Sequence, residues 1–234
     1  MIISHSKKFI FIKTNKTAST SLQVFLSQFL DKDKDIISKG LEEDNKKIYE
    51  LSRIKNKDWA VKSKKNFLER IIFFKPKIKY FNHDTSIKDI INFYDQNTIS
   101  NYHKITIVRN PFEQIISSIN WHNYFRTKYV NKNEVPVSKL IGNYSKKFFQ
   151  IEKEKLLYKG EIFMDQIIKY ENLENDINKF LKIKKFKSKI DIKNLQYKTK
   201  IPKKIHSLNK EQKKIIFNQA EFFFSNFYPN MNPL

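Results

Sequence analysis

Apolar and polar residues form alternating blocks along this chain, and the blocks predict strands that are each followed by a helix. The run 9–12, Phe-Ile-Phe-Ile, is continuous and apolar, which is typical of a strand buried on both faces. A polar stretch, 13–21, separates it from a predicted helix. That helix has its apolar side chains at helical spacing: Leu22, Phe25, Leu26 and Phe29. This segment therefore predicts a strand, a loop and a helix.

The same pattern recurs later in the chain. The run 105–108, Ile-Thr-Ile-Val, predicts another buried strand, which stops at Arg109. Pro111 favours a helix start, because the N–H that proline lacks would have no partner at the first helical position. The apolar face of this helix consists of Phe112, Ile115, Ile116 and Ile119.

Weaker patterns complete the predicted order of elements. We expect strands at 77–81 and 167–170, and helices at 86–95, 173–181 and 209–225. The stretch 31–75 is charged and mostly helix-like, and 182–206 is a lysine-rich loop. Strands that alternate with helices predict an α/β fold of three layers with a central parallel sheet, whose ligands bind at the carboxyl ends of the strands. No repeat or linker interrupts the pattern, so residues 1–234 are expected to form a single domain.

Composition limits the class of protein. Of the 234 residues, 40% are hydrophobic, which is enough for a sizeable core. The chain has no cysteine, so disulfides and cysteine-based zinc sites are excluded. No apolar run reaches the roughly 18 residues that a membrane span needs, and the N-terminal run 9–12 is too short for a signal peptide. We expect a cytoplasmic protein with no membrane span.

The net charge is +22, from 46 Lys and Arg against 24 Asp and Glu. Such a charge attracts anions, whether nucleotide, acidic polysaccharide or nucleic acid. A biased use of lysine explains the charge equally well. Only four arginines occur, so each is a candidate for a position that needs a planar, bidentate donor.

The first predicted turn, Lys16-Thr17-Ala18-Ser19-Thr20-Ser21, lies between a buried strand and a helix start. Its backbone N–H groups would point outward beside the positive end of the helix dipole, and hydroxyls and a lysine add further donors. This arrangement suits a phosphate or sulfate group. It lacks the glycines of a Walker A loop, and an ordinary Ser/Thr helix cap would have the same composition.

The second predicted turn begins at Arg109, and Ser117 follows eight residues later, in about the second turn of the next helix. Ser117 and Glu113 are four residues apart and share a helix face. Arg109 could bind a phosphate through two N–H groups while Ser117 donates its hydroxyl. The alternative is a structural arginine paired with a carboxylate.

Together the two turns resemble the nucleotide-binding motifs of sulfotransferases that use 3′-phosphoadenosine-5′-phosphosulfate (PAPS). Residues 16–21 resemble the 5′-phosphosulfate loop, most closely that of the heparan sulfate 2-O-sulfotransferase group. The run 108–113 with Ser117 resembles the 3′-phosphate motif. Segments 163–165 and 169–173, with Asp176, resemble a third recurring stretch, so the resemblance covers about 9–181. Two residues depart from the family pattern, because Asn110 replaces the usual Asp and Asn15 the usual Pro.

The resemblance implies a P-loop-like sulfotransferase that moves a sulfuryl group from PAPS to an acceptor hydroxyl, with PAP (the desulfated donor) as product and no metal. His83 is implied as the catalytic base, and Lys16 as the acid or electrostatic stabiliser of the leaving group. Residues 16–21, Arg109 and Ser117 would bind the nucleotide, and Lys198 and Thr199 its adenosine end. The family leans toward carbohydrate hydroxyls, so an acidic glycan is a possible acceptor.

Three other interpretations remain open. A P-loop-type small-molecule kinase would use the same architecture, although its magnesium-binding pattern is missing. A basic nucleic-acid-binding protein would explain the charge, but no known nucleic-acid-binding motif occurs. A member of the sulfotransferase family could also bind the nucleotide without catalysis.

Overall fold

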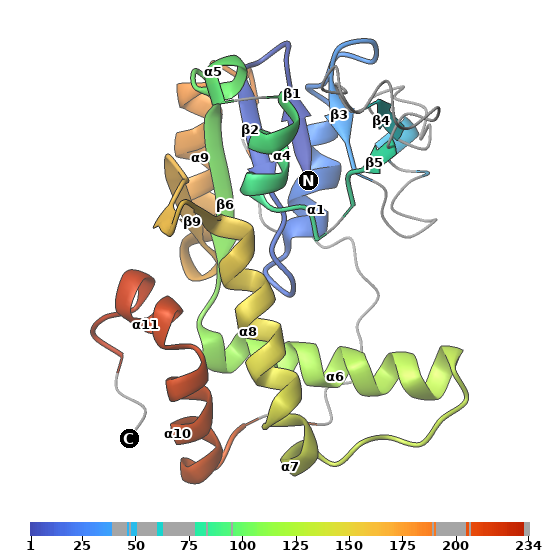
Figure 1. Ribbon diagram of the computed structural model, residues 1–234, viewed down its shortest axis with the longest axis vertical. Helices are drawn as coiled ribbons and strands as arrows, with labels where there is room; N and C mark the ends of the chain where they lie inside the picture. The colour runs from blue at the N-terminus through green and yellow to red at the C-terminus, as the bar shows by residue number, and fades with distance from the viewer. Residues whose placement is uncertain are drawn as a thin grey trace, which may run out of the picture.

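A computed structural model describes residues 1–38, 46, 48–50, 60–62, 78–82, 84–94, 96–188, 190, 205 and 207–231. Its centre is a five-stranded sheet with the order β3-β1-β2-β6-β9 (Figure 1). The strands of this sheet are β1 (Ile2–Ser4), β2 (Phe9–Ile12), β3 (Ile36–Ile37), β6 (His103–Val108) and β9 (Gln166–Lys169).

The sheet is mixed, whereas the sequence predicted a parallel one. The three strands β2, β6 and β9 are parallel, with Phe11 opposite Ile105 and Ile107 opposite Ile168. Strand β1 is antiparallel to β2, and β3 is antiparallel to β1. The physical reason is the short connection between β1 and β2, because a few residues can reverse the chain but cannot make the crossover that parallel strands require.

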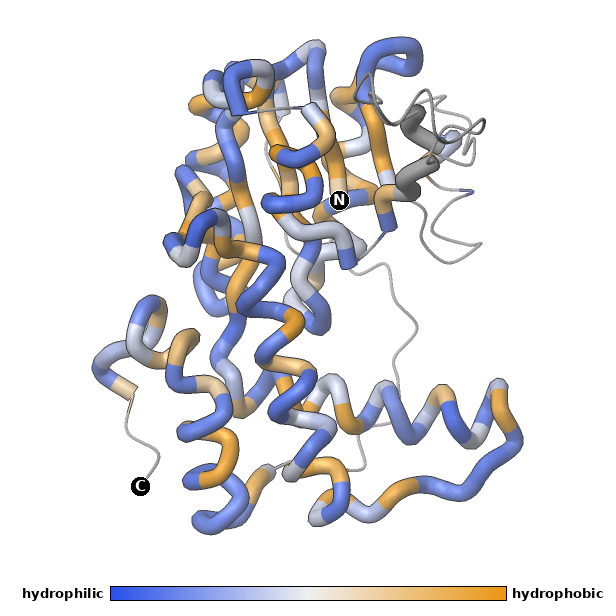
Figure 2. Tube along the Cα trace, viewed as in Figure 1, coloured by the Kyte–Doolittle hydropathy of each residue, from blue (hydrophilic) through white to orange (hydrophobic). Residues whose placement is uncertain are grey.

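Alternate side chains of the central strands pack on opposite faces of the sheet. Phe9 and Phe11 contact the helices α1 (Ser19–Ser27) and α9 (Leu173–Ile183). Ile10 and Ile12 join a second core cluster on the other face, with α4 (Ile87–Tyr94) and α8 (Asn143–Leu156). Helices therefore cover both faces, and Figure 2 shows apolar segments in the central strands as well as in the helices. Continuous apolar runs in the sequence follow from this two-sided burial.

The second core cluster extends from the sheet into a helical region. Figure 1 shows α8 running from the sheet into this region, where it lies near three further helices. These are α6 (Pro111–Tyr129), α7 (Val137–Leu140) and α10 (Lys210–Gln219). The chain then turns at the fully buried Ala220 and continues as α11 (Glu221–Phe227). The single helix predicted over 209–225 is therefore two helices.

Small elements complete the described part of the chain. Strand β5 (Ile78–Tyr80) was expected in the main sheet, but it pairs with β4 (Ala60–Lys62) in a separate antiparallel sheet. A hairpin joins β7 (Leu157–Tyr158) to β8 (Glu161–Ile162). The remaining elements are α5 (Gln96–Ile99) and a 3₁₀ turn, η1 (Tyr170–Asn172).

Most of the other predicted elements are confirmed. Strands β2, β6 and β9 match the three apolar runs, and α4 and α9 lie where helices were expected. Helix α6 has Pro111 in its first turn and Asn110 as its N-cap. The loop predicted at 182–206 lies largely outside the described residues, as does most of 31–75. No helix in the described ranges is long and apolar enough to cross a membrane.

Candidate functional site: two adjoining turns beyond the central strands

The turns that follow β2 and β6 are in direct contact. These strands are parallel neighbours with Ile12 opposite Thr106, so their carboxyl ends lie at the same edge of the sheet. Beyond that edge, Nη1 of Arg109 donates a hydrogen bond to the carbonyl oxygen of Lys16 at 3.1 Å. The structure thus brings together the two residues on which the sequence-based hypothesis depends.

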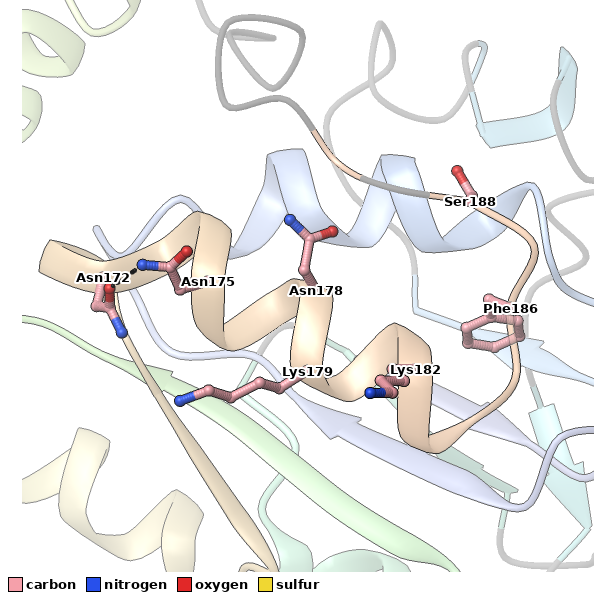
Figure 3. Close-up of a pocket in the computed structure, with 7 residues that line it drawn as sticks. All are labelled: Asn172, Asn175, Asn178, Lys179, Lys182, Phe186 and Ser188. Atoms are coloured by element: carbon pink, nitrogen blue, oxygen red, sulfur yellow. Dashed lines mark hydrogen bonds between the residues drawn. The ribbon is translucent and has the colours of Figure 1, made fainter.

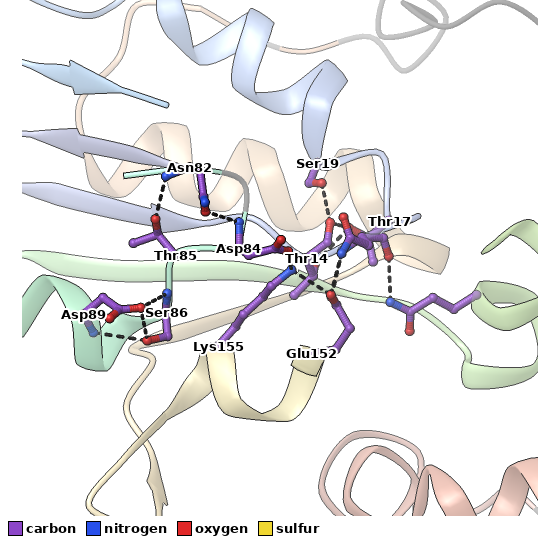
Figure 4. A network of polar contacts seen from close by, with 12 residues as sticks. Thr14, Thr17, Ser19, Asn82, Asp84, Thr85, Ser86, Asp89, Glu152 and Lys155 are labelled. Atoms are coloured by element: carbon purple, nitrogen blue, oxygen red, sulfur yellow. Dashed lines mark hydrogen bonds and ion pairs between the residues drawn. The ribbon is translucent and has the colours of Figure 1, made fainter. Parts of the chain in front are cut away.

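Hydroxyl groups hold the first turn in shape from within (Figure 4). Thr14 is buried, and its hydroxyl donates to the carbonyl of Ile107 in the neighbouring strand. The hydroxyls of Thr17 and Ser19 both donate to the carbonyl of Thr14, and the hydroxyl oxygens of Thr14 and Thr17 lie 2.9 Å apart. Thr17 and Ser19 therefore stabilise the loop with their side chains, and only their backbone N–H groups remain for a ligand.

The backbone of this turn presents a row of N–H donors. None of the five N–H groups from Thr17 to Ser21 has an acceptor among the described residues. Lys16 and Ala18 have φ angles of 62° and 61°, a left-handed conformation that costs a residue other than glycine about 1–2 kcal/mol. Turns of this kind direct successive N–H groups into one concavity, which binds anions beside the helix N-terminus.

The guanidinium of Arg109 is packed between the two turns and a neighbouring aromatic ring. Its central carbon lies 4.3 Å from the ring centroid of Tyr170, and Nη2 lies 3.6 Å from Oε2 of Glu113. Its Nε is buried and has no hydrogen-bond partner among the described residues. A buried donor without an acceptor costs about 1–3 kcal/mol, so this atom is a candidate contact for an anionic ligand.

Three further hydroxyls near the two turns have no hydrogen-bond partner in the described part of the chain. They belong to Thr20 and Ser21 at the start of α1 and to Ser117 in the second turn of α6. All three were candidate nucleotide contacts in the sequence. Unlike Thr17 and Ser19, they can bind a ligand through the side chain without loss of an internal hydrogen bond.

The ammonium group of Lys16 lies 4.9 Å from the ring centroid of Trp121 on α6, a cation–π contact. Trp121 was not predicted as a site residue. It lies four residues after Ser117, and this spacing places both side chains along one face of the helix. That spacing is the signal that could have identified it.

A buried ion network lies beneath the first turn (Figure 4). Oε2 of Glu152 on α8 accepts from the backbone N–H of Asn15 at 2.7 Å, and Oε1 accepts from Nδ2 of Asn15 at 2.8 Å and from Nζ of Lys155 at 2.7 Å. Nζ of Lys155 also lies 3.1 Å from Oδ1 of Asp84. The side chains of Glu152 and Lys155 are 0% and 1% exposed. Sequence reasoning missed this pair, because a glutamate and a lysine three residues apart usually mark a solvated helix face.

The third segment of the resemblance packs against the second turn. Besides the contact of Tyr170 with Arg109, the carboxylate of Glu171 accepts from the backbone N–H of Asn110 at 2.6 Å and from the hydroxyl of Tyr228 at 2.9 Å. Burial raises the pKa of the Tyr228 phenol, and the adjacent carboxylate raises it further. The hydroxyl therefore keeps its proton and holds the turn between η1 and α11.

Three of the predicted site residues, His83, Lys198 and Thr199, lie outside the described residues. The expectation that placed His83 at the edge of the main sheet relied on the strand before it, and that part is wrong because β5 belongs to the small sheet. Its neighbour Asp84 nevertheless contacts Lys155, which belongs to the network under the first turn.

The remaining described histidines have structural contacts. His5 hydrogen-bonds the hydroxyls of Tyr102 and Tyr94, and burial lowers the pKa of its ring. His103 contacts the side chain of Gln166 at 3.2 Å. The ring of His122 on α6 packs 5.1 Å from that of Tyr144, and burial lowers its pKa too.

A separate open pocket of about 590 Å³ lies along α9 (Figure 3). Its lining consists of Asn172, Asn175, Asn178, Lys179, Lys182, Phe186 and Ser188, and it includes none of the predicted site residues. The amide of Asn178 bonds the backbone of Ile190, and that of Asn172 bonds Asp176. These asparagines thus support the local fold, and the two adjoining turns remain the stronger candidate site.

Comparisons of the chain with models of known protein families, with curated proteins and with solved structures gave no match. The candidate site therefore depends on its own geometry, a pair of cationic turns with backbone donors at one edge of the sheet.

Proposed function

We propose that this protein is a sulfotransferase that moves a sulfuryl group from PAPS to a hydroxyl of an acceptor. The observation that carries the proposal is the 3.1 Å hydrogen bond between Arg109 and the carbonyl of Lys16. It joins the two turns that resemble the 5′-phosphosulfate loop and the 3′-phosphate motif, so a single bisphosphorylated nucleotide can contact both. In this proposal the β2–α1 and β6–α6 units belong to a P-loop-like architecture.

The donor set fits such a nucleotide. The N–H groups of residues 17–21 and the hydroxyls of Thr20 and Ser21 would bind the 5′-phosphosulfate end. Arg109, with its buried Nε, and the hydroxyl of Ser117 would bind the 3′-phosphate. Lys198 and Thr199 remain predicted contacts of the adenosine. The carboxylate nearest to Arg109 belongs to Glu113, which is 56% exposed and can move into solvent.

Sulfuryl transfer requires an in-line displacement at sulfur. The acceptor oxygen forms a bond to sulfur while the bond from sulfur to the 5′-phosphate oxygen breaks, and PAP leaves with the electron pair of that bond. The proton of the acceptor hydroxyl passes to a base, for which His83 is our candidate. Lys16 and the N–H groups of the turn stabilise the negative charge that develops on the leaving phosphate oxygen.

Binding of PAP to an Arg109→Ala variant tests the nucleotide site. The lost charged hydrogen bonds are worth about 2–4 kcal/mol, so the dissociation constant should rise about 30- to 1,000-fold. Arg126→Ala is the matched control, because Arg126 lies on α6 and donates to the carbonyl of Asn133. Titration calorimetry measures both. Equal PAP affinity in the two variants would assign Arg109 a structural role.

The donor itself is tested by thermal unfolding with PAP, PAPS or ATP. A ligand at 100 times its dissociation constant stabilises the folded state by about 2.7 kcal/mol. We expect PAP and PAPS to raise the melting temperature more than ATP does. Stabilisation by ATP alone would replace this proposal with a kinase, and binding of DNA with no effect of PAP would replace it with a nucleic-acid-binding function.

The role of His83 is tested by turnover of labelled PAPS with a panel of glycans, lipids and small alcohols as acceptors. His83→Ala should abolish turnover and leave PAP affinity close to that of the wild type, because the base contacts the acceptor hydroxyl and not the nucleotide. Unchanged turnover would remove His83 from the mechanism.

A further inference from the structure

The outer end of α6 projects from the helical region as part of an arm. Figure 1 shows α6 extending away from the other helices and the chain returning beside it to α7. The amide of Asn123 joins the two limbs, because it donates to the backbone carbonyl of Val135 and accepts from the backbone N–H of Val135, each at 3.0 Å. Nε of Arg126 also donates to the carbonyl of Asn133 at 3.1 Å. We call residues 123–136 the arm, and these hydrogen bonds give it a defined shape.

Apolar side chains are exposed toward the outer end of the arm. Phe125 and Tyr129 are 43% and 60% exposed, and Val130, which follows directly, is 43% exposed. We call these three residues the apolar tip. They make up nearly half of the exposed large hydrophobic side chains in the described part of the chain. Exposed apolar side chains gathered in this way mark binding surfaces.

Positive charge surrounds the apolar tip. Between residues 124 and 139 the chain has four cationic residues and one acidic residue, so this stretch carries a net charge of +3. Lys128, Lys132 and Lys139 are all exposed. The whole chain carries +22, and a charge of this size attracts an anionic surface before any contact is made.

The aromatic rings of the arm have neighbours over their faces. The rings of Phe125 and Tyr129 pack against each other, with centroids 5.3 Å apart and planes inclined by 34°. Nζ of Lys128 lies over the rings of Tyr124 and Tyr129, at 5.2 and 5.4 Å from their centroids. A planar ligand such as a nucleobase stacks on an open ring face. Insertion among lipids requires only exposed apolar surface, so this arrangement favours a lipid surface.

We propose that the arm attaches this protein to an anionic membrane surface, with the apolar tip inserted at the level of the lipid headgroups. Aromatic side chains favour this level of a membrane, because it is the boundary between acyl chains and water. The stems of the lysines can lie along apolar surface while their ammonium groups reach the lipid phosphates. A second copy of the chain fits the tip less well, because it carries the same net charge of +22 and would be repelled.

Sedimentation with lipid vesicles tests the attachment. One set of vesicles contains phosphatidylcholine and phosphatidylserine, and the other contains phosphatidylcholine alone, both at about 0.15 M salt. Phe125→Ser/Tyr129→Ser removes most of the apolar tip, and Lys128→Gln/Lys132→Gln removes two of the cations beside it. A single-stranded oligonucleotide serves as a second anionic probe.

Each variant has a matched control at another exposed surface. Ile183→Ser is the control for the tip variant, because Ile183 is 57% exposed at the end of α9. Lys182→Gln/Lys187→Gln is the control for the lysine variant, because it removes two exposed cations from the same region as Ile183. Thermal unfolding followed by circular dichroism should be alike in all of these proteins, because the replaced side chains lie at the surface.

We expect the wild type and both controls to bind the anionic vesicles, and to bind phosphatidylcholine alone much more weakly. The tip variant should bind the anionic vesicles at least about tenfold more weakly, the factor that burial of about 55 Å² of apolar surface supplies. The lysine variant should lose about fivefold for each cation removed, or about 25-fold in total. Its difference from the control should shrink as the salt concentration rises.

A fluorescent label distinguishes insertion from purely electrostatic attachment. The chain has no cysteine, so Val130→Cys and Ile183→Cys each provide a single site for a dye whose emission depends on its surroundings. On anionic vesicles we expect a blue shift for the dye at position 130 and none for the dye at position 183, because only the tip enters the lipid.

Four results would overturn the proposal. They are no binding of the wild type to anionic vesicles, equal vesicle affinity in either variant and its control, an unshifted dye at position 130 in the bound protein, and a tip variant that loses affinity for the oligonucleotide and not for vesicles. The last result would make the arm a nucleic-acid contact. All of these measurements are made without PAP, so failure of the proposed sulfotransferase function would leave them unaffected.

Discussion

Replacement of Glu152 by glutamine tests whether the buried network supports the first turn. The carboxylate is fully buried and accepts three hydrogen bonds, two from Asn15 and one from Lys155. Glutamine has nearly the same shape, but it removes the charge opposite Lys155 and brings an NH₂ group toward other donors. The variant therefore changes the electrostatics of the site and hardly changes its packing.

The expected loss follows from these contacts. Removal of one partner of a buried ion pair costs about 3–5 kcal/mol. Lys155 keeps a second partner in Asp84. The side chain of Asp84 is 48% exposed, so solvent weakens this second ion pair. We therefore expect a loss of about 3 kcal/mol, at the low end of that range. This is a large part of the 5–15 kcal/mol that stabilises a typical domain.

Urea unfolding followed by circular dichroism measures this loss. The midpoint should fall while the slope m stays the same, because the surface exposed on unfolding is unchanged. Glu154→Gln is the matched control, since Glu154 is exposed on the same helix and bonds only Gln150 among the described residues. Its stability should stay within about 0.5 kcal/mol of the wild type. If Glu152→Gln also lost less than about 1 kcal/mol, the carboxylate would not be the support that we infer.

Two further predictions concern the same region and the N-terminal hairpin. Asn15→Pro removes both hydrogen bonds to Glu152, worth about 1.5–3 kcal/mol each, so it should lower the free energy of unfolding. In a urea double-mutant cycle this loss should be clearly smaller when Glu152 has already been replaced by glutamine, and equal losses in both backgrounds would contradict the network. Burial lowers the pKa of His5 below its ordinary 6.5, so the unfolded chain binds the proton more readily than the folded one. The free energy of unfolding should therefore fall as the pH drops through 6.5 toward 5. His5→Gln should reduce this pH dependence, and an unchanged dependence would mean that other groups cause it.

The parts of the fold that the sequence predicted are those with two-sided burial or a distinct cap. Strands β2 and β6 are continuous apolar runs because helices cover both faces of the sheet. The start of α6 was marked by Pro111 directly after the capping Asn110. Strand β1 was not predicted, because two isoleucines between the initial methionine and a serine make too short a run. Its burial depends on neighbours that the local pattern does not reveal.

Strand partners and helix breaks were not predictable in the same way. The segment 77–81 has the pattern of a strand, but the pattern does not say which strand it pairs with, and β5 pairs with β4. The periodic pattern at 209–225 contains no glycine or proline. The break at Ala220 is stabilised by hydrogen bonds in which its N–H donates to Ile216 and its carbonyl accepts from Phe223 and Phe224.

For the candidate site too, some features could be predicted from the sequence and others could not. Lys16 and Arg109 could be placed together because parallel neighbouring strands end at one edge, whatever their side chains. Their support could not be predicted, because Glu152 lies 137 residues from Asn15 in the chain, in a helix whose charged residues look solvated. Burial of that glutamate depends on the packing of α8 under the turn, which has no local sequence signal.

The two residues that depart from the sulfotransferase pattern, Asn15 and Asn110, both make hydrogen bonds with neighbouring groups in this structure. A proline at position 15 could donate neither of the two hydrogen bonds that Asn15 makes with Glu152. Asn110 caps α6 by accepting from the N–H of Phe112, a role that an aspartate could also perform. Its amide nitrogen, however, approaches the sulfur of Met231 at 3.3 Å, and a carboxylate could not donate there. An aspartate would also lie close to Glu171, which accepts the backbone N–H of residue 110 at 2.6 Å, and the two carboxylates would repel each other. The two asparagines therefore fit the local charges around each turn, and they leave the N–H and guanidinium donors of the candidate site in place.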